Sequence, residues 1–249
     1  MRGYTQKNKL YVIFLFCFIV TRLSSQNPFI ENKGQLPEQV KAQLHLKSGS
    51  LFFEKDKLIY SFYSGEKLAL AHDLGRGNTT IDAHAYKVEF VDGGNNSKIE
   101  LFKESSYFEN YFLGKENKWA RKVKSYKILF QKNIYEGVDV KYYVEKDKLK
   151  YEIIVDPNIT TNQIQIKYNG VDNIMLKSDN IYIITSVNTI KENKPYAYQK
   201  INGKQVEVEC NYVLQNNILS FSFPKGYNKD EQLIIDPVLE FSTYSGSTT

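Results

Sequence analysis

The 249-residue sequence is 42% hydrophobic and 14% aromatic, which excludes a globally disordered chain because the apolar residues suffice for a core. It carries 33 basic and 28 acidic residues, but residues 1–25 hold four of the basic residues and no acid. The remaining charges nearly balance, at 29 basic and 28 acidic, which excludes a whole-protein field favouring nucleic acid or an anionic membrane.

The N-terminus has the pattern of a secretory signal peptide. Basic residues within 2–9 precede an unbroken apolar run at 10–20, and small polar residues follow. The run of 11 residues is shorter than the roughly 20 needed to span a bilayer. We therefore predict cleavage near Ser25, an exported protein at the cell surface or outside the cell, and no transmembrane helix in the mature chain. A lipoprotein attached through Cys17 is the less favoured alternative, because no small residue precedes that cysteine.

Cleavage would leave Cys210 as the only cysteine, which excludes an intramolecular disulfide. Cys210 belongs to an alternating apolar set at 206–214, and this pattern predicts a small hydrophobic side chain buried in a strand. An exposed reactive thiol is the alternative.

Apolar residues alternate with polar ones along most of the chain, which predicts short strands. In the first half we expect helix only as a short segment within 34–46 and a turn or two within 105–119. The predicted hairpins of this half join 51–53 to 58–60, 86–90 to 99–101, and 138–144 to 149–155.

The second half continues the pattern, with further strands at 164–168 and 219–223. Asn202-Gly203 predicts a tight hairpin because both residues tolerate positive φ. The hairpins predicted here join 174–176 to 181–185 and 196–201 to 205–214. About 14 to 18 short strands predict an all-β chain of two tandem antiparallel β-sandwich-like modules.

Two similar phrases end strands in the same way. YEIIVDP closes at Asp156-Pro157 and LIIDP at Asp236-Pro237, 80 residues later. Proline cannot donate to a β-ladder, and the aspartate side chain can fix the turn. We therefore predict a first module at 26–157 and a second at 158–237, with a linker at 238–249. A chance repetition remains the alternative.

No common catalytic motif or phosphate-binding loop is found in the sequence, and we predict no cofactor. The one metal-site hypothesis uses His72, Asp82 and His84, because two imidazoles and a carboxylate can hold a divalent ion. A solvated loop with incidental histidines is the favoured interpretation.

Aromatic side chains offer a second kind of site, because exposed rings stack against sugars. Aromatic residues in strands more often belong to the core, and that interpretation is favoured. The candidate ligand-binding residues are Trp119, Tyr142, Tyr143, Tyr196 and Tyr198.

Several phrases occur in an order that resembles one known family. They are NKGQ (32–35), NYFLG (110–114) with Lys-Trp shortly after, IYEGVDVKYY (134–143), LKYEIIVDPN (149–158), KPYAYQKINGK (194–204) and LIIDPVLEFSTYSG (233–246). Together they resemble the N-terminal domain that precedes SBBP repeats, the "seven-bladed beta-propeller" repeats of exported bacterial surface proteins, many of them type IX-secreted.

The resemblance implies export and a following propeller, and it supplies no catalytic residues. It makes 238–249 the start of a propeller repeat as an alternative to a linker. No repeat or sorting domain follows Thr249, so we expect a truncated gene, a fragment or a domain that acts alone.

These observations favour a non-catalytic extracellular β-rich module with a structural or adhesive, ligand-binding role. Its partner would be an extracellular polymer or protein, or a following propeller domain, and not nucleic acid. The alternative is a carbohydrate-binding module or glycan-active enzyme domain, and a third hypothesis is a metal-stabilised module.

Overall fold

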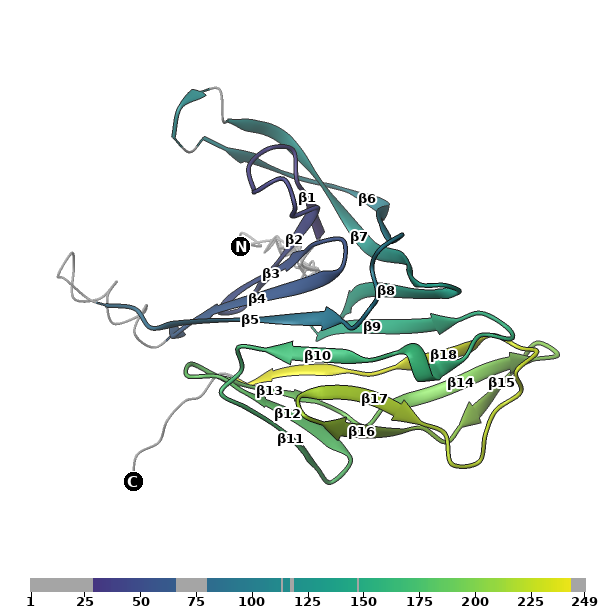
Figure 1. Ribbon diagram of the computed structural model, residues 1–249. Coiled ribbons are helices and arrows are strands. Elements are labelled where there is room, and N and C mark those ends of the chain that lie inside the picture. The colour runs from purple at the N-terminus through teal and green to yellow at the C-terminus, as the bar shows by residue number, and fades with distance from the viewer. Residues whose placement is uncertain (1–28, 66–79, 113, 117–118, 147, 243–249) are drawn as a thin grey trace, which may run out of the picture.

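The computed structural model describes residues 29–65, 80–112, 114–116, 119–146 and 148–242 (Figure 1). The predicted signal peptide, Cys17 and His72 lie outside these ranges. Among the described residues, no helix has the length and apolar character needed to cross a bilayer.

The described residues form 19 strands and one 3₁₀ turn, η2 (Thr161–Gln163), so the predicted all-β class is confirmed. The strands are β1 (Phe29–Glu31), β2 (Ala42–Leu46), β3 (Gly49–Phe53), β4 (Lys57–Tyr63), β5 (Ala83–Phe90), β6 (Lys98–Tyr111), β7 (Ala120–Tyr135), β8 (Val138–Glu145), β9 (Lys148–Val155), β10 (Ile166–Asn169), β11 (Asn173–Lys177), β12 (Asn180–Ile184), β13 (Thr189–Glu192), β14 (Tyr196–Ile201), β15 (Lys204–Val208), β16 (Asn211–Gln215), β17 (Ile218–Ser222), β18 (Leu233–Asp236) and β19 (Leu239–Ser242).

Two antiparallel sheets make up the fold. The larger has 15 strands in the order β15-β14-β18-β9-β8-β7-β1-β2-β3-β4-β5-β10-β17-β16, with β6 paired to β7. The smaller has the order β11-β12-β13-β19. At one end of the large sheet β16 lies near β11 of the smaller sheet, and the β6–β7 hairpin extends away from the rest (Figure 1).

The large sheet is continuous across the predicted module boundary at residue 157. β10 pairs with β5, and β18 pairs with β9, so strands from residues 158–237 join strands from 26–157 at two places. Residues 239–242 form β19, which pairs with β13 of the smaller sheet. The two halves of the sequence therefore share one hydrogen-bonded framework.

The hairpins predicted from local alternation are present in all but one case. β3–β4, β8–β9 and β11–β12 pair as expected. β14 pairs with β15 through the turn at Asn202 and Gly203, whose φ values are 50° and 76°. This hairpin is shorter than predicted, because β15 ends at Val208 and the later part of 205–214 belongs to β16, which pairs with β17. The predicted pairing of 86–90 with 99–101 is wrong. β5 already has β4 on one side and β10 on the other, so no free edge remains, and β6 pairs with β7 instead.

The predicted helix within 34–46 is wrong, and the segment 105–119 is largely strand, although the Trp119 N–H donates to the Glu116 carbonyl oxygen at 3.0 Å and closes one helical turn. The amide of Asn32 donates to the carbonyl oxygens of Pro37 and Val40 at 2.9 and 2.7 Å, which organises residues 32–40 as a loop. Part of the second segment, 105–119, belongs to β6, which extends to Tyr111. The first segment contains β2, which forms backbone hydrogen bonds with β3, and the second contains part of β6, which forms them with β7. Local propensity does not reveal such pairing with neighbouring strands.

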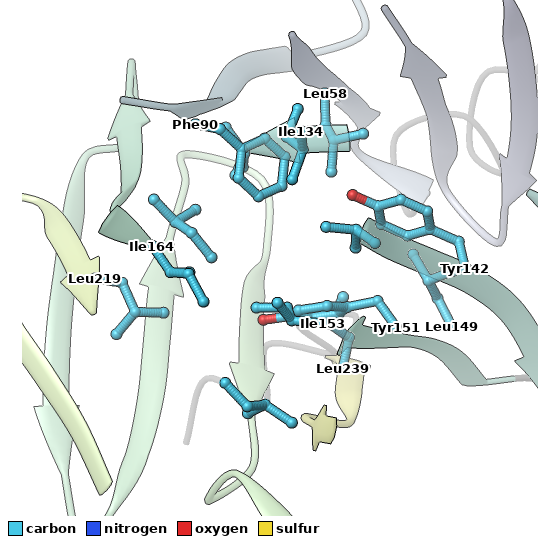
Figure 2. Packing of buried hydrophobic residues seen from close by; sticks show 14 of the residues in the cluster. Leu58, Phe90, Ile134, Tyr142, Leu149, Tyr151, Ile153, Ile164, Leu219 and Leu239 are labelled. Atoms are coloured by element: carbon cyan, nitrogen blue, oxygen red, sulfur yellow. The ribbon is translucent and has the colours of Figure 1, made fainter. Parts of the chain in front are cut away.

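The two sheets contribute to one hydrophobic core. Figure 2 shows Tyr151 and Ile153 of β9 beside Leu239, which comes from β19 of the smaller sheet. Tyr142 of β8 is buried in the same core, where its ring meets Phe53 edge-to-face at 5.1 Å. Alternation along β8 and β9 places every second side chain in this interior.

A buried carboxylate connects the sheets. Glu192 of β13 is 1% exposed, and its Oε1 accepts hydrogen bonds from the hydroxyls of Tyr151 and Tyr212, both at 2.7 Å. Tyr168 donates to Oε2 at 3.5 Å. The three tyrosines belong to β9, β16 and β10 of the large sheet. Burial raises the pKa of Glu192 above its usual 4.5, although the three hydrogen bonds oppose that shift.

The two Asp-Pro phrases lie side by side. β18 runs antiparallel to β9, with Leu233 opposite Val155 and Ile235 opposite Ile153. The repeated apolar runs therefore pair with each other, and Asp156 and Asp236 lie at opposite ends of that pair.

Candidate functional site

A group of polar and aromatic side chains covers the outward side of β8, β9, β18 and β14. Because alternate residues of these strands enter the core, their neighbours necessarily share the opposite side of the sheet. We call the central part of this surface the acidic tyrosine face; it consists of Tyr143, Glu152, Asp236, Tyr196 and Tyr198.

The hydrogen-bond register aligns these side chains across the strands. Lys141 of β8 lies opposite Glu152 of β9, and Asp236 of β18 lies opposite Tyr196 of β14. The pairing of β18 with β9, continued one residue beyond Ile235, brings Asp236 opposite Glu152. Directly opposed side chains on antiparallel strands have Cβ atoms about 4.5–5.5 Å apart, so the two carboxylates are neighbours.

Glu152 is held by groups of β8. Lys141 Nζ donates to its Oε2 at 2.8 Å, and the Tyr143 hydroxyl donates to its Oε1 at 3.1 Å. Burial raises the pKa of Tyr143, and the negative charges of Asp236 and Glu152 raise it further. Tyr143 therefore stays a neutral hydroxyl donor at physiological pH, and Glu152 is an ion-paired carboxylate fixed in one orientation.

Asp236 has a different environment. Its Oδ1 is shielded from solvent, and no protein donor among the described residues lies within hydrogen-bond distance. Burial raises the pKa of Asp236, the Lys150 ammonium opposes this, and the Glu152 charge adds to it. An unsatisfied acceptor at such a position costs about 1–3 kcal/mol.

Two tyrosine rings border the carboxylates. Tyr196 and Tyr198 alternate along β14, and their rings stack with centroids 5.8 Å apart and planes 30° apart. Tyr196 is 38% exposed, and its hydroxyl accepts a hydrogen bond from Gln205 of β15 at 3.1 Å. Burial raises the pKa of Tyr198, with Glu152 and Asp236 contributing, so this hydroxyl also remains protonated.

The combination of an exposed tyrosine ring, tyrosine hydroxyls and two carboxyl groups on one surface suits a polyhydroxylated ligand. Rings accept the apolar C–H side of such a molecule, while carboxylate oxygens accept its hydroxyl hydrogens. These are the two kinds of contact that specific small-molecule sites combine.

The structure brings together three of the five aromatic candidates. Tyr143, Tyr196 and Tyr198 belong to the acidic tyrosine face, but Tyr142 does not, since its 2% exposed ring lies in the core and its hydroxyl donates to Gln131 Oε1 at 2.7 Å. Consecutive residues of a strand point to opposite sides, so only one member of the Tyr142–Tyr143 pair can reach solvent.

Trp119 lies away from this surface, next to the β6–β7 hairpin. Its ring meets Phe112 edge-to-face at 5.2 Å, and the Arg121 guanidinium lies 5.6 Å from the centroid of each ring. Arg121 therefore covers part of the ring surface that a sugar would need, and Trp119 stands apart from the three tyrosines.

The metal-site residues are not assembled in the described part of the chain, where no three histidine, cysteine or acidic side chains converge. His72 lies outside it, and Asp82 is exposed. His84 Nε2 is 2.7 Å from the Gly170 carbonyl oxygen, and its Nδ1 accepts from the Ser186 backbone N–H at 3.3 Å. Both ring nitrogens are thus engaged by protein, which leaves His84 no lone pair for a metal while these bonds hold.

Cys210 is 2% exposed, in agreement with the predicted burial. Burial raises the pKa of its thiol to about 12, so the reactive thiolate is scarce at neutral pH.

Sequence reasoning missed the two carboxylates of the face. The sequence identified Asp236 only as a strand-ending residue and did not single out Glu152. The missing information was the pairing of β9 with β18, which brings together Glu152 and Asp236 although 236 − 152 = 84 positions separate them in the chain.

Comparison with known proteins gives one family match. A family model described as "Domain of unknown function (DUF7948)" matches residues 29–238. No curated protein and no solved structure matches the chain significantly.

Proposed function

The chain belongs to the DUF7948 family of domains of unknown function, and we propose that it is a non-catalytic binding module that takes carbohydrate at the acidic tyrosine face. The observation that carries this proposal is the convergence of Tyr143, Tyr196 and Tyr198 around Glu152 and Asp236, with Asp236 Oδ1 lacking a protein donor. In this role a sugar ring packs on Tyr196, and its hydroxyls donate to Asp236.

The proposed setting is extracellular. The basic and apolar pattern of residues 1–20 supports export, and the ordered phrases that resemble the domain before SBBP repeats support a place ahead of a propeller in a surface protein. A sugar-binding domain in that position would attach its protein to an extracellular polymer, which is the adhesive role favoured by the sequence.

The binding role is tested with purified protein lacking residues 1–25. We expect a glycan array to show a discrete set of ligands, and calorimetry to show that Tyr196→Ala and Asp236→Asn each weaken the best one about tenfold or more. Tyr107→Ala is the matched control, because Tyr107 is 52% exposed on β6, outside the face. The proposal would be refuted if no glycan of the array bound the protein, or if Tyr196→Ala and Asp236→Asn bound the best ligand as tightly as the wild type does.

A glycan-active enzyme is the second candidate, favoured by the adjacent carboxylates. Glu152 is ion-paired and Asp236 has a raised pKa, and retaining glycosidases use two carboxyl groups about 5–5.5 Å apart, one of them as the acid. Chromatography of oligosaccharides incubated with the protein distinguishes the roles. If the protein forms products and both Asp236→Asn and Glu152→Gln abolish them, the proposed function is that of a hydrolase and not of a binding module.

A further inference from the structure

A cleft separate from the acidic tyrosine face lies where the end of the β8–β9 hairpin meets β2 and β19. Its volume is about 550 Å³, within the range of small-molecule sites. β2 and the β8–β9 hairpin belong to the large sheet and β19 to the smaller one, so the cleft is at the junction of the two sheets.

The floor of the cleft is apolar. Leu44, Leu149 and Leu239 are 1%, 2% and 5% exposed, and partly buried Leu46 and Val144 lie beside them. Figure 2 shows Leu149 and Leu239 among the core side chains, which means that the bottom of the cleft continues into the rigid core. An alkyl chain entering here would exchange water for aliphatic side chains.

The rim of the cleft is cationic. Lys47, Lys146 and Lys148 line it together with His45, and Glu240 is the one acid among its described lining residues. Lys148 forms an ion pair with Glu240, whereas Lys47 and Lys146 have no acidic side chain within 4.0 Å among the described residues. Two ammonium groups beside the apolar floor are therefore outside any close ion pair of the described residues, although the Glu145 carboxylate interacts with Lys146 at longer range.

We propose that this cleft binds an amphiphilic anion, namely a free medium-chain carboxylate whose alkyl chain lies on the leucine floor and whose head group meets Lys47 and Lys146. The charge of the rim selects the anionic head, and the apolar floor selects the chain. Neither feature uses a residue of the acidic tyrosine face, so this proposal stands independently of carbohydrate binding.

The proposal is tested by calorimetric titration of the purified protein with sodium decanoate. We expect saturable binding of one decanoate per chain and an octanoate affinity lower by about fourfold for each methylene removed. Acetate lacks the chain and 1-decanol lacks the charge, and both should bind at least tenfold more weakly. Equal binding of decanol and decanoate, or no saturable decanoate binding, would overturn the proposal.

Variants locate the site. Lys47→Gln combined with Lys146→Gln should weaken decanoate about tenfold or more, while Lys225→Gln, which changes an 83% exposed lysine that does not line the cleft, should leave the affinity unchanged. Thermal melting confirms that each variant is folded. Unchanged decanoate affinity in the double variant would overturn the assignment. Binding of an acidic peptide at the cleft, together with no binding of decanoate, would overturn it as well.

Discussion

Glu192 provides a direct test of how the two sheets are joined, through the pair of substitutions Glu192→Gln and Glu192→Leu. Its carboxylate accepts three tyrosine hydroxyls from the large sheet while it is itself on β13 of the smaller sheet. Glutamine keeps an acceptor oxygen in place and removes the buried charge. Leucine has a similar size but leaves the hydroxyls without their acceptor.

The magnitude for leucine follows from the hydrogen bonds. Tyr212 has an alternative acceptor in the Asn193 carbonyl oxygen at 2.9 Å, whereas Glu192 is the one acceptor of Tyr151 and of Tyr168 among the described residues. Each unsatisfied buried hydroxyl costs about 1–3 kcal/mol, so Glu192→Leu should lower the free energy of unfolding by roughly 2–6 kcal/mol.

The effect of glutamine depends on pH. In the folded chain the pKa of Glu192 is raised above 4.5. Glu192 therefore keeps its proton in the folded chain at pH values where the unfolded chain has already released that proton. The stabilisation from this group is complete below the unfolded pKa and is lost as pH rises through the folded pKa. Between the unfolded and the folded pKa of Glu192, the wild type should lose up to about 1.4 kcal/mol of stability per pH unit relative to Glu192→Gln.

Urea unfolding, followed by tyrosine fluorescence and circular dichroism between pH 4 and pH 8, measures both effects. We expect the stability of Glu192→Gln minus that of the wild type to increase from pH 4 toward neutrality. A difference that is constant or decreases with rising pH would refute the reasoning, because it would show that the tyrosine hydrogen bonds outweigh the desolvation of the charge.

Three further predictions test the core and its turns. Gly137→Ala should destabilise the chain by about 1–3 kcal/mol, because the φ of Gly137 is +67° and an added Cβ would lie 2.5 Å from Ile159 Cγ1. Urea unfolding measures the change, and unchanged stability would contradict the turn geometry. Tyr142→Phe should lower the unfolding free energy by about 1–2 kcal/mol through loss of the bond to Gln131, and a neutral result would mean that this bond adds nothing. Cys210 should react with a thiol reagent far more slowly in the native protein than in denaturant, and rapid native labelling would show that it is accessible.

Features that depend on near neighbours in the chain were predictable. The alternation in β8 and β9 and the Asn202-Gly203 turn specify hairpins by themselves, because side-chain period and backbone φ are local properties. The same reasoning failed for β6, since its choice of partner depended on which strand edges were already occupied by β4 and β10.

The candidate site was partly within reach of the sequence. Tyr143, Tyr196 and Tyr198 were identifiable as aromatic residues in strands, but their grouping with Glu152 and Asp236 was not. That grouping requires the pairing of β18 with both β9 and β14, and neither pairing leaves a local signal.

The sequence by itself determined an all-β chain with short antiparallel hairpins, because apolar alternation and turn residues act over a few positions. Tertiary structure alone decided that YEIIVDP and LIIDP are neighbouring strands of one sheet, and that Glu192 is enclosed by tyrosines from three strands. The physical reason is that long-range strand pairing and burial depend on the edges and faces left available by the whole fold.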